Sequence, residues 1–168
     1  MALEPVTRVF AYGTLRGDFS STGDRWGVLA DTGGTWKKAS VRGFKIYQRS
    51  DLFYPFAVHS SSNEDVVLGT LLEWPTDEES YAAIARCNRI EGFDPERPDD
   101  GMYQRSVVDI CLEGGETRKA YIYHQELPAE TSGKKIDSFP HGDWLRGRLE
   151  GPPSCHEVTV TPENVMMS

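Results

Sequence analysis

The sequence predicts an α+β domain built on a compact, mainly antiparallel sheet, because several β-prone segments surround one clear helical pattern. The strand pattern is clearest over residues 103–112, where side chains alternate in polarity before the hairpin signal Glu113-Gly-Gly-Glu116. The helical pattern follows Pro75, with Thr76 as the expected N-cap and Glu79 completing a capping box. In total we expect five or six strands and one helix.

The first third of the chain contributes two of these strands. Residues 7–12 form a short β-prone run, and residues 40–47 form a second one in which we expect Gly43 to make a bulge. Between them, residues 17–38 hold five glycines and few apolar side chains, so we expect a long loop. Residues 53–58 are aromatic and apolar and are expected to be buried.

The middle and the end of the chain contribute the remaining elements. Residues 65–74 predict a strong strand, and the helix after it is expected to end near residues 90–92. Residues 117–123 are the expected partner of the strand before the hairpin turn, and residues 157–161 are a candidate edge strand. We expect one helix face to hold Tyr81, Ile84, Ala85 and Asn88, and a docked corner to be made by Gly142, Asp143 and Trp144.

Length and composition favour one domain with a core of its own. The chain has 168 residues, of which 38% are hydrophobic and 26% charged. We expect residues 1–150 to form a single domain and residues 151–168 to form a C-terminal extension that is partly mobile.

Charge and cysteine content exclude several classes of function. The net charge of −8 argues against nucleic-acid binding and against an anionic lipid surface. There is no apolar run of membrane-spanning length and no signal-peptide pattern, so we expect a cytoplasmic protein without a membrane partner. The cysteines at 87, 111 and 155 are widely spaced, which is typical of a reduced protein without a zinc site.

The loop after the first strand is a candidate ligand site. Its sequence, Tyr12-Gly-Thr-Leu15, could point successive backbone N–H groups into one concavity, with Gly13 permitting the turn and Thr14 adding a hydroxyl. Such a nest binds a carboxylate or stabilises an oxyanion. A plain strand end is the alternative, and the tetrapeptide alone favours it. The loop lacks the glycine spacing of a P-loop or a dinucleotide fingerprint, which excludes nucleotide binding.

Glu91 is the candidate general base. It lies between Ile90 and Gly92-Phe93, where partial desolvation would raise the pKa of a carboxyl group toward neutral pH. A solvated glutamate at a helix end is the alternative, and the residue taken alone favours it. On the following strand, Tyr103 could hydrogen-bond a substrate or orient the base, and Arg105 could hold a carboxylate or form a structural salt bridge.

Other chemistries find no support in the sequence. The four histidines are scattered and none pairs at metal-ligand spacing, so we expect no metal. There is also no Gly-x-Ser-x-Gly elbow for a nucleophilic serine.

Several motifs, taken in order, resemble the gamma-glutamylcyclotransferase-like superfamily. The match begins at Tyr12-Gly-Thr-Leu-Arg-Gly17 and spans about residues 8–145; the variant motifs are most similar to the gamma-glutamylamine cyclotransferase and avirulence-induced-like branches. At one position the chain has Asn88 where the family often has Asp. The other matching motifs are Gly43 with Tyr47, Pro55, Val67-x-Gly69-x-Leu71, Ile90-Glu91-Gly92, Tyr103-x-Arg105-x-Val107-x-Asp109, Ala120-Tyr-x-Tyr123 and Gly142-Asp-Trp144.

This resemblance implies a fold, a reaction and a site. The implied fold is a small mixed, mainly antiparallel β-barrel with flanking helices and a pocket at its mouth. The implied reaction converts a small γ-glutamyl substrate to 5-oxoproline without a cofactor, in a monomer or weak dimer. Glu91 would be the general acid and base, and the substrate-binding residues would be Tyr12, Gly13, Thr14, Leu15, Tyr103 and Arg105. The alternatives are a non-catalytic protein that binds a small ligand in the same pocket, and an interaction protein without a ligand.

Overall fold

The computed structural model describes residues 5–18, 32–49, 54–126, 136–139 and 142–144. The expected edge strand at 157–161 and the expected extension at 151–168 lie outside these residues. Within them, no helix is both long and apolar enough to cross a membrane. The elements, in chain order, are β1 (Val9–Ala11), β2 (Thr35–Arg42), β3 (Phe44–Arg49), β4 (Phe56–His59), β5 (Val66–Glu73), α1 (Asp77–Glu91), β6 (Gln104–Leu112), β7 (Thr117–His124) and β8 (Ile136–Ser138).

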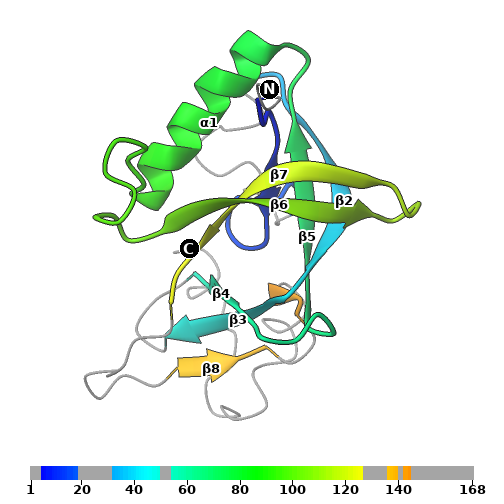
Figure 1. Ribbon diagram of the computed structural model, residues 1–168. Coiled ribbons are helices and arrows are strands. Elements are labelled where there is room, and N and C mark those ends of the chain that lie inside the picture. The colour runs from blue at the N-terminus through cyan, green and yellow to red at the C-terminus, as the bar shows by residue number, and fades with distance from the viewer. Residues whose placement is uncertain (1–4, 19–31, 50–53, 127–135, 140–141, 145–168) are drawn as a thin grey trace, which may run out of the picture.

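Five strands close into a barrel. They follow the order β1-β5-β2-β6-β7, and a parallel contact between Val9 of β1 and Tyr121 of β7 joins the two ends. All other barrel pairs are antiparallel, including the long β6–β7 hairpin that crosses the front of Figure 1. The expected mixed, mainly antiparallel barrel is therefore confirmed, with α1 as its one helix among the described residues.

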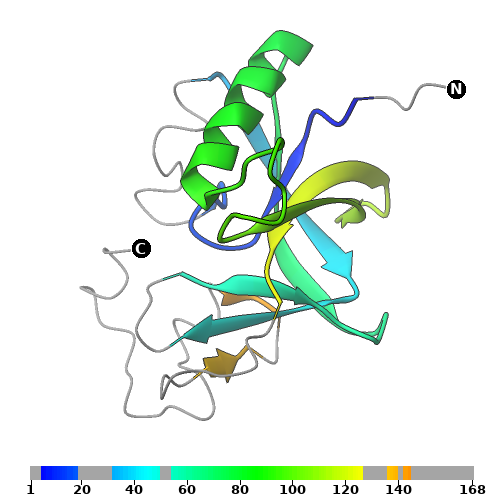
Figure 2. The same ribbon diagram turned by 60° about the vertical axis from the view of Figure 1, so that its left-hand side comes forward.

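Strands β4, β3 and β8 form an arm attached to one side of the barrel. β4 joins β7 through a single parallel pair, Ala57 with His124, and β3 pairs antiparallel with both β4 and β8. Figure 2 shows these three strands together below the barrel, on the side away from most of α1. The strand pairing that joins the arm to the barrel is therefore narrow.

One expected strand proved to be two. We expected residues 40–47 to form one strand with a bulge at Gly43, but Gly43 has φ +83 and separates β2 from β3. Its N–H donates to Asp65 O and its carbonyl accepts from Ser60 N, both at 2.8 Å. A left-handed residue ends the ladder, so the chain leaves the barrel here and enters the arm. Strand β2 also starts at Thr35, inside the segment expected to be a loop.

Helix α1 begins and ends as the sequence predicts. The Thr76 hydroxyl accepts the Glu79 N–H at 3.1 Å, and Gly92 provides a left-handed C-cap. The buried face was predicted only in part, because Tyr81 is 46% exposed and Ala85 is also exposed. Small side chains allow the helix to approach the barrel closely, and its buried residues are Ser80, Ala83, Ile84, Cys87 and Asn88.

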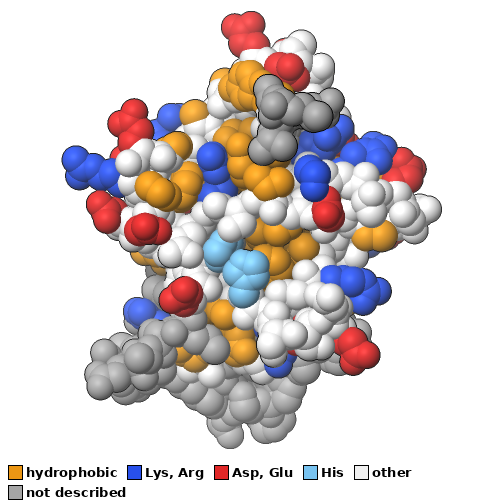
Figure 3. Space-filling model, viewed as in Figure 1, with side chains coloured by type: hydrophobic (Ala, Val, Ile, Leu, Met, Phe, Trp, Pro, Cys, Tyr) orange, Lys and Arg blue, Asp and Glu red, His pale blue; other side chains and the backbone are white. Residues whose placement is uncertain are grey.

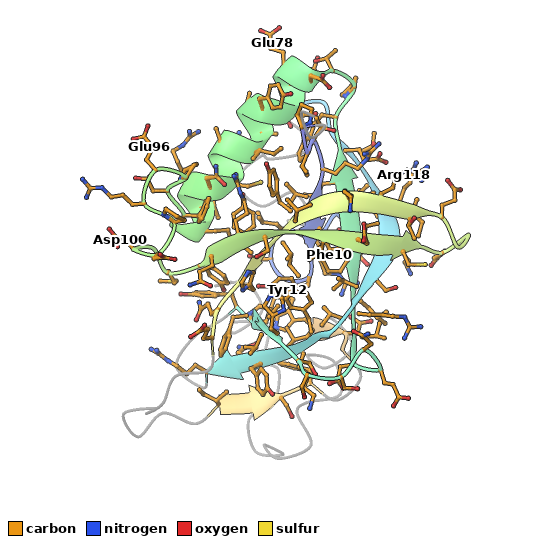
Figure 4. The ribbon with its side chains drawn as sticks, viewed as in Figure 1. Phe10, Tyr12, Glu78, Glu96, Asp100 and Arg118 are labelled. Carbon is orange, nitrogen blue, oxygen red and sulfur yellow. The ribbon has the colours of Figure 1, made fainter. Side chains whose placement is uncertain are left out.

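Two apolar clusters hold these parts together. One lies among the strands of the barrel and arm and includes Phe10, which Figure 4 shows among the barrel strands, and Trp144, which is 1% exposed. The Trp144 indole also donates to Gln48 Oε1 of β3 at 2.8 Å, which confirms the expected docked corner. The other cluster packs the inner face of α1, including Ala83, against β1, β5 and β7. The second cluster sets the position of the Glu91 end of the helix.

Candidate active site

A cavity of about 160 Å³ lies where β1, α1 and the segment before β4 meet. Figure 4 shows Tyr12 at the centre of the molecule, between the barrel and the arm. Six of the seven site residues expected from the sequence line the cavity, namely Tyr12, Gly13, Thr14, Leu15, Glu91 and Tyr103. The other lining residues are Val9, Phe10, Ala11, Tyr54, Pro55, Ile90, Met102 and Tyr123.

The turn after β1 presents unused backbone donors. Arg16 N–H donates to Gly13 O at 3.0 Å, which closes the turn, and Gly17 N–H donates to Thr70 Oγ1 at 2.9 Å. Within the described part of the chain, the N–H groups of Gly13, Thr14 and Leu15 have no hydrogen-bond acceptor. All three residues are buried. A run of unpaired buried N–H groups is suited to bind an anion or a developing oxyanion.

Gly13 is required for a reason other than the one we expected. Gly13 does not have a positive φ, so the backbone conformation of the turn does not itself require glycine. A Cβ at this position would lie 2.8 Å from Cγ of Pro55, which is closer than real contacts allow. Glycine therefore permits the Pro55 ring to pack against the turn, and this contact forms one wall of the cavity.

The hydroxyl groups of Tyr12 and Tyr103 are used within the protein. The Tyr12 hydroxyl donates to Tyr123 O at 2.5 Å and accepts from Ala57 N at 3.0 Å, while the Tyr103 hydroxyl donates to Pro55 O at 2.8 Å. Burial raises the pKa of both phenols well above the usual value, and the nearby Glu91 carboxylate raises it further. Both side chains are therefore neutral and hold the walls of the cavity in place.

Glu91 is the last residue of α1 and is half-buried. Burial is the main cause that raises the pKa of four neighbouring groups, and the negative charge of Glu91 raises each of them further: Tyr12, Tyr103, Tyr123 and Cys87. The thiol of Cys87 reaches a pKa of about 12 and stays protonated. These four groups therefore stay neutral and do not compete with the carboxylate for a proton.

Arg105 lies behind the cavity rather than in its lining. Its guanidinium carbon is 3.9 Å from the ring centroid of Tyr121 and 4.7 Å from that of Phe93, and Nη1 donates to Asn88 Oδ1 at 3.2 Å. The structure therefore does not bring Arg105 together with the other expected site residues.

Eight cavity residues were not predicted as parts of the site, and four of them lie outside β1 and α1: Tyr54, Pro55, Met102 and Tyr123. Pro55 and Tyr123 belong to motifs that the sequence showed only as parts of strands. Tyr54 and Met102 are in irregular segments, where no periodic pattern indicates which way a side chain points. The Tyr54 hydroxyl reaches Met102 Sδ at 3.8 Å.

The described residues contain no group of three or more His, Cys, Asp or Glu side chains that could hold a metal ion. The candidate site, as far as the structure describes it, combines one carboxylate residue, a set of backbone N–H donors and an aromatic wall. Such a set can move a proton and stabilise negative charge on an oxygen.

The described residues form a closed barrel with one helix, and Glu91 lines a small cavity beside it. The chain belongs to the family described as gamma-glutamyl cyclotransferase, AIG2-like, whose model matches residues 9–146. This membership supports the general cyclotransferase type. No curated protein matches the chain in sequence.

Solved structures share the fold at low sequence identity. The human protein loc79017 is 16% identical with a TM-score of 0.56, and the match covers 95% of this chain and 96% of that one. A structure titled gamma-glutamyl cyclotransferase is 13% identical with a TM-score of 0.52, covering 96% and 98%. The Arabidopsis thaliana protein At3g28950.1 is 22% identical with a TM-score of 0.53, covering 86% and 73%.

Proposed function

We propose that this protein is a γ-glutamyl cyclotransferase that releases 5-oxoproline and a free amine or amino acid from a small γ-glutamyl compound. One observation carries the proposal: Glu91 lines the same small cavity as Gly13, Thr14 and Leu15, whose N–H groups have no acceptor among the described residues. A base and an anion-binding nest in one pocket are the groups that an intramolecular acyl transfer requires.

In the proposed reaction, the substrate's own α-amine is the nucleophile. Glu91 takes one proton from the α-ammonium group, and the freed nitrogen lone pair attacks the γ-carbonyl carbon to close a five-membered ring. The carbonyl oxygen becomes an oxyanion as the new C–N bond forms. The bond to the departing nitrogen then breaks while Glu91 returns its proton to that nitrogen. The ring nitrogen loses a second proton, which the released amine carries away as its ammonium form.

The turn after β1 supplies the electrostatic part of the proposal. The N–H groups of Gly13, Thr14 and Leu15 bind the substrate carboxylate or the developing oxyanion, and the Thr14 hydroxyl adds a further polar group. Losing one donor of this kind typically costs about 3 kcal/mol in the barrier. Because the reaction is intramolecular, the cavity mainly has to hold the substrate folded in near-attack geometry.

The aromatic wall supplies shape in this proposal. The hydroxyl groups of Tyr12 and Tyr103 donate to backbone carbonyls. We therefore propose that these two residues contact the substrate through their rings and not through hydrogen bonds. Arg105 is given no contact with the substrate, because it lies outside the lining.

Product analysis tests this function. The purified protein is incubated with a panel of γ-glutamyl amino acids, γ-glutamyl-ε-lysine, simple γ-glutamylamines and glutathione, and 5-oxoproline is followed by mass spectrometry. We expect 5-oxoproline from at least one member, which also names the leaving group. A folded protein that binds a member of the panel without releasing 5-oxoproline would contradict the proposal and support the binding-protein alternative.

A further inference from the structure

The Glu91 end of α1 is held by a cluster that the proposed reaction does not use. Asn88 lies three residues before Glu91, and its side chain is buried, with 8% of the residue exposed. Its side-chain oxygen accepts two hydrogen bonds. Its Oδ1 accepts from the Tyr123 hydroxyl at 2.6 Å and from Arg105 Nη1 at 3.2 Å. The Asn88 carbonyl also accepts the Phe93 N–H at 2.8 Å. One side chain thus connects the end of the helix to both strands of the β6–β7 hairpin.

Arg105 is the cation of this cluster, and its described partners are all neutral. It lies between the rings of Phe93 and Tyr121 and donates to the Asn88 amide. Among the described residues, no carboxylate oxygen lies within 4.0 Å of its guanidinium nitrogens, in contrast to the paired Arg8 and Arg16. Stacking between aromatic faces suits a guanidinium, but it leaves the positive charge without an anionic contact.

The charges of Arg105 and Glu91 act on the same hydroxyl group. Burial and the neighbouring Cys87 raise the pKa of Tyr123, the charge of Arg105 lowers it, and the charge of Glu91 raises it. The charge of Glu91 also raises the pKa of Tyr12, Tyr103 and Cys87. Arg86, on the same helix, acts on Cys87. Arg105 contacts α1 through Asn88, one helical turn before Glu91, and both charges act on Tyr123.

We propose that Arg105, held in place by Asn88, is a positioning residue for Glu91: it fixes the end of α1 against the hairpin and supplies a positive charge that favours the ionised carboxylate. This inference rests on the proposed function, since it assigns a role in preparing the general base. An opposite charge nearby favours the charged form of a carboxyl group. Because position 88 holds Asn and not Asp, this position adds no carboxylate that would cancel that charge.

Two substitutions test the charge in different ways. Arg105→Met removes the charge and keeps an unbranched side chain between the two rings, while Asn88→Asp keeps both acceptor bonds and neutralises Arg105. We expect both to move the acid limb of the kcat/KM–pH profile in the same direction, to higher pH by about half a unit or more. Arg105→Lys keeps the charge and should leave the acid limb at the wild-type pH.

The matched control is Arg118→Met, on the far end of the same hairpin, where Arg118 pairs with Glu116 at 2.7 Å (Figure 4). A purely structural cluster would lower thermal stability without moving the acid limb. The inference would be overturned if the acid limb stayed at the wild-type pH in both Arg105→Met and Asn88→Asp.

A second readout separates this inference from the proposed function. The titration midpoint of Glu91 can be followed by NMR of carboxyl-labelled protein, without any substrate. If the wild-type protein makes no 5-oxoproline, the proposed function fails, yet the midpoint should still rise in both variants. An unchanged midpoint would overturn the role of Arg105 whether or not the protein is active.

Discussion

At the scale of single residues, Tyr12 shows how one side chain can join three parts of this protein. It follows β1, and its hydroxyl bonds to the Tyr123 carbonyl of β7 and to the Ala57 N–H of β4. It therefore connects the barrel to the arm at the narrow junction between them. The sequence suggested a substrate contact, whereas the geometry gives the hydroxyl a structural partner on each side.

We expect Tyr12→Phe to lower the free energy of unfolding by about 1–3 kcal/mol, because it leaves a buried N–H and a buried carbonyl without partners. Chemical denaturation followed by circular dichroism measures this. The control is Tyr81→Phe, which changes a tyrosine that is 46% exposed on α1 and should have little effect. Equal stability of both variants with wild type would contradict the structural role.

Gly13→Ala should reduce kcat/KM about tenfold or more, since the new Cβ would displace Pro55 and shift the N–H groups of the turn. Steady-state kinetics on the best substrate of the panel tests this. Gly114→Ala, in the β6–β7 turn where a Cβ would meet only a flexible glutamate side chain at 3.8 Å, should leave kcat/KM unchanged. A fully active Gly13→Ala protein would show that the close packing of Pro55 is not needed.

At the scale of elements, the two ends of α1 have different roles in this proposal: the N-terminal cap stabilises the helix, and the C-terminal residue is the proposed general base. Thr76 caps the first turn, and Glu91 ends the helix at the cavity. A helix of this length, 15 residues, spans about 22 Å. The cap is therefore remote from the chemistry that we propose.

Thr76→Ala should lower the free energy of unfolding by about 1 kcal/mol through loss of the bond to Glu79 N–H. Its kcat/KM should stay at the wild-type value at a temperature where both proteins are folded. Thermal unfolding and steady-state kinetics on the same samples check both parts. A large loss of activity without a loss of stability would mean that the two ends of the helix are coupled.

The elements that the sequence predicted well are those with local signals. The cap at Thr76, the hairpin turn at 113–116 and the strand at 65–74 depend on residues close together in the chain. The split at Gly43 and the inner face of α1 depend on tertiary contacts, which no local pattern contains. For the same reason the sequence could bring the turn and Glu91 together only through a resemblance. The resemblance also implied that Arg105 binds substrate, and no local pattern shows that its guanidinium stacks on Tyr121 outside the cavity lining.

At the scale of the whole molecule, the junction between barrel and arm contains a pair of histidines. These are His59 and His124, whose ring centroids lie 4.9 Å apart. Figure 3 shows histidine side chains at the centre of this face of the molecule. His124 Nε2 is 2.7 Å from Ser106 Oγ, and burial followed by the neighbouring His59 lowers the pKa of His124 to about 4. The folded protein therefore keeps His124 neutral at pH values where an unfolded chain would protonate it.

Stability should therefore fall as the pH is lowered from about 6.5 toward 4, because the unfolded state binds a proton that the folded state excludes. Above about pH 6.5 this contribution is fully present. Thermal unfolding across this range should show the slope in wild type and a weaker slope in His124→Gln. The same slope in both proteins would show that His124 is not its source.

In the proposed reaction Glu91 takes a proton from the α-ammonium group and returns it to the departing nitrogen, and one comparison tests this role most directly. The rate of 5-oxoproline release is measured for wild type, for Glu91→Gln and for Glu96→Gln, which changes an exposed glutamate of the neighbouring loop (Figure 4). We predict a loss of about 10²–10⁴-fold in Glu91→Gln, an unchanged fold and a wild-type rate in Glu96→Gln. A wild-type rate in folded Glu91→Gln would contradict the account.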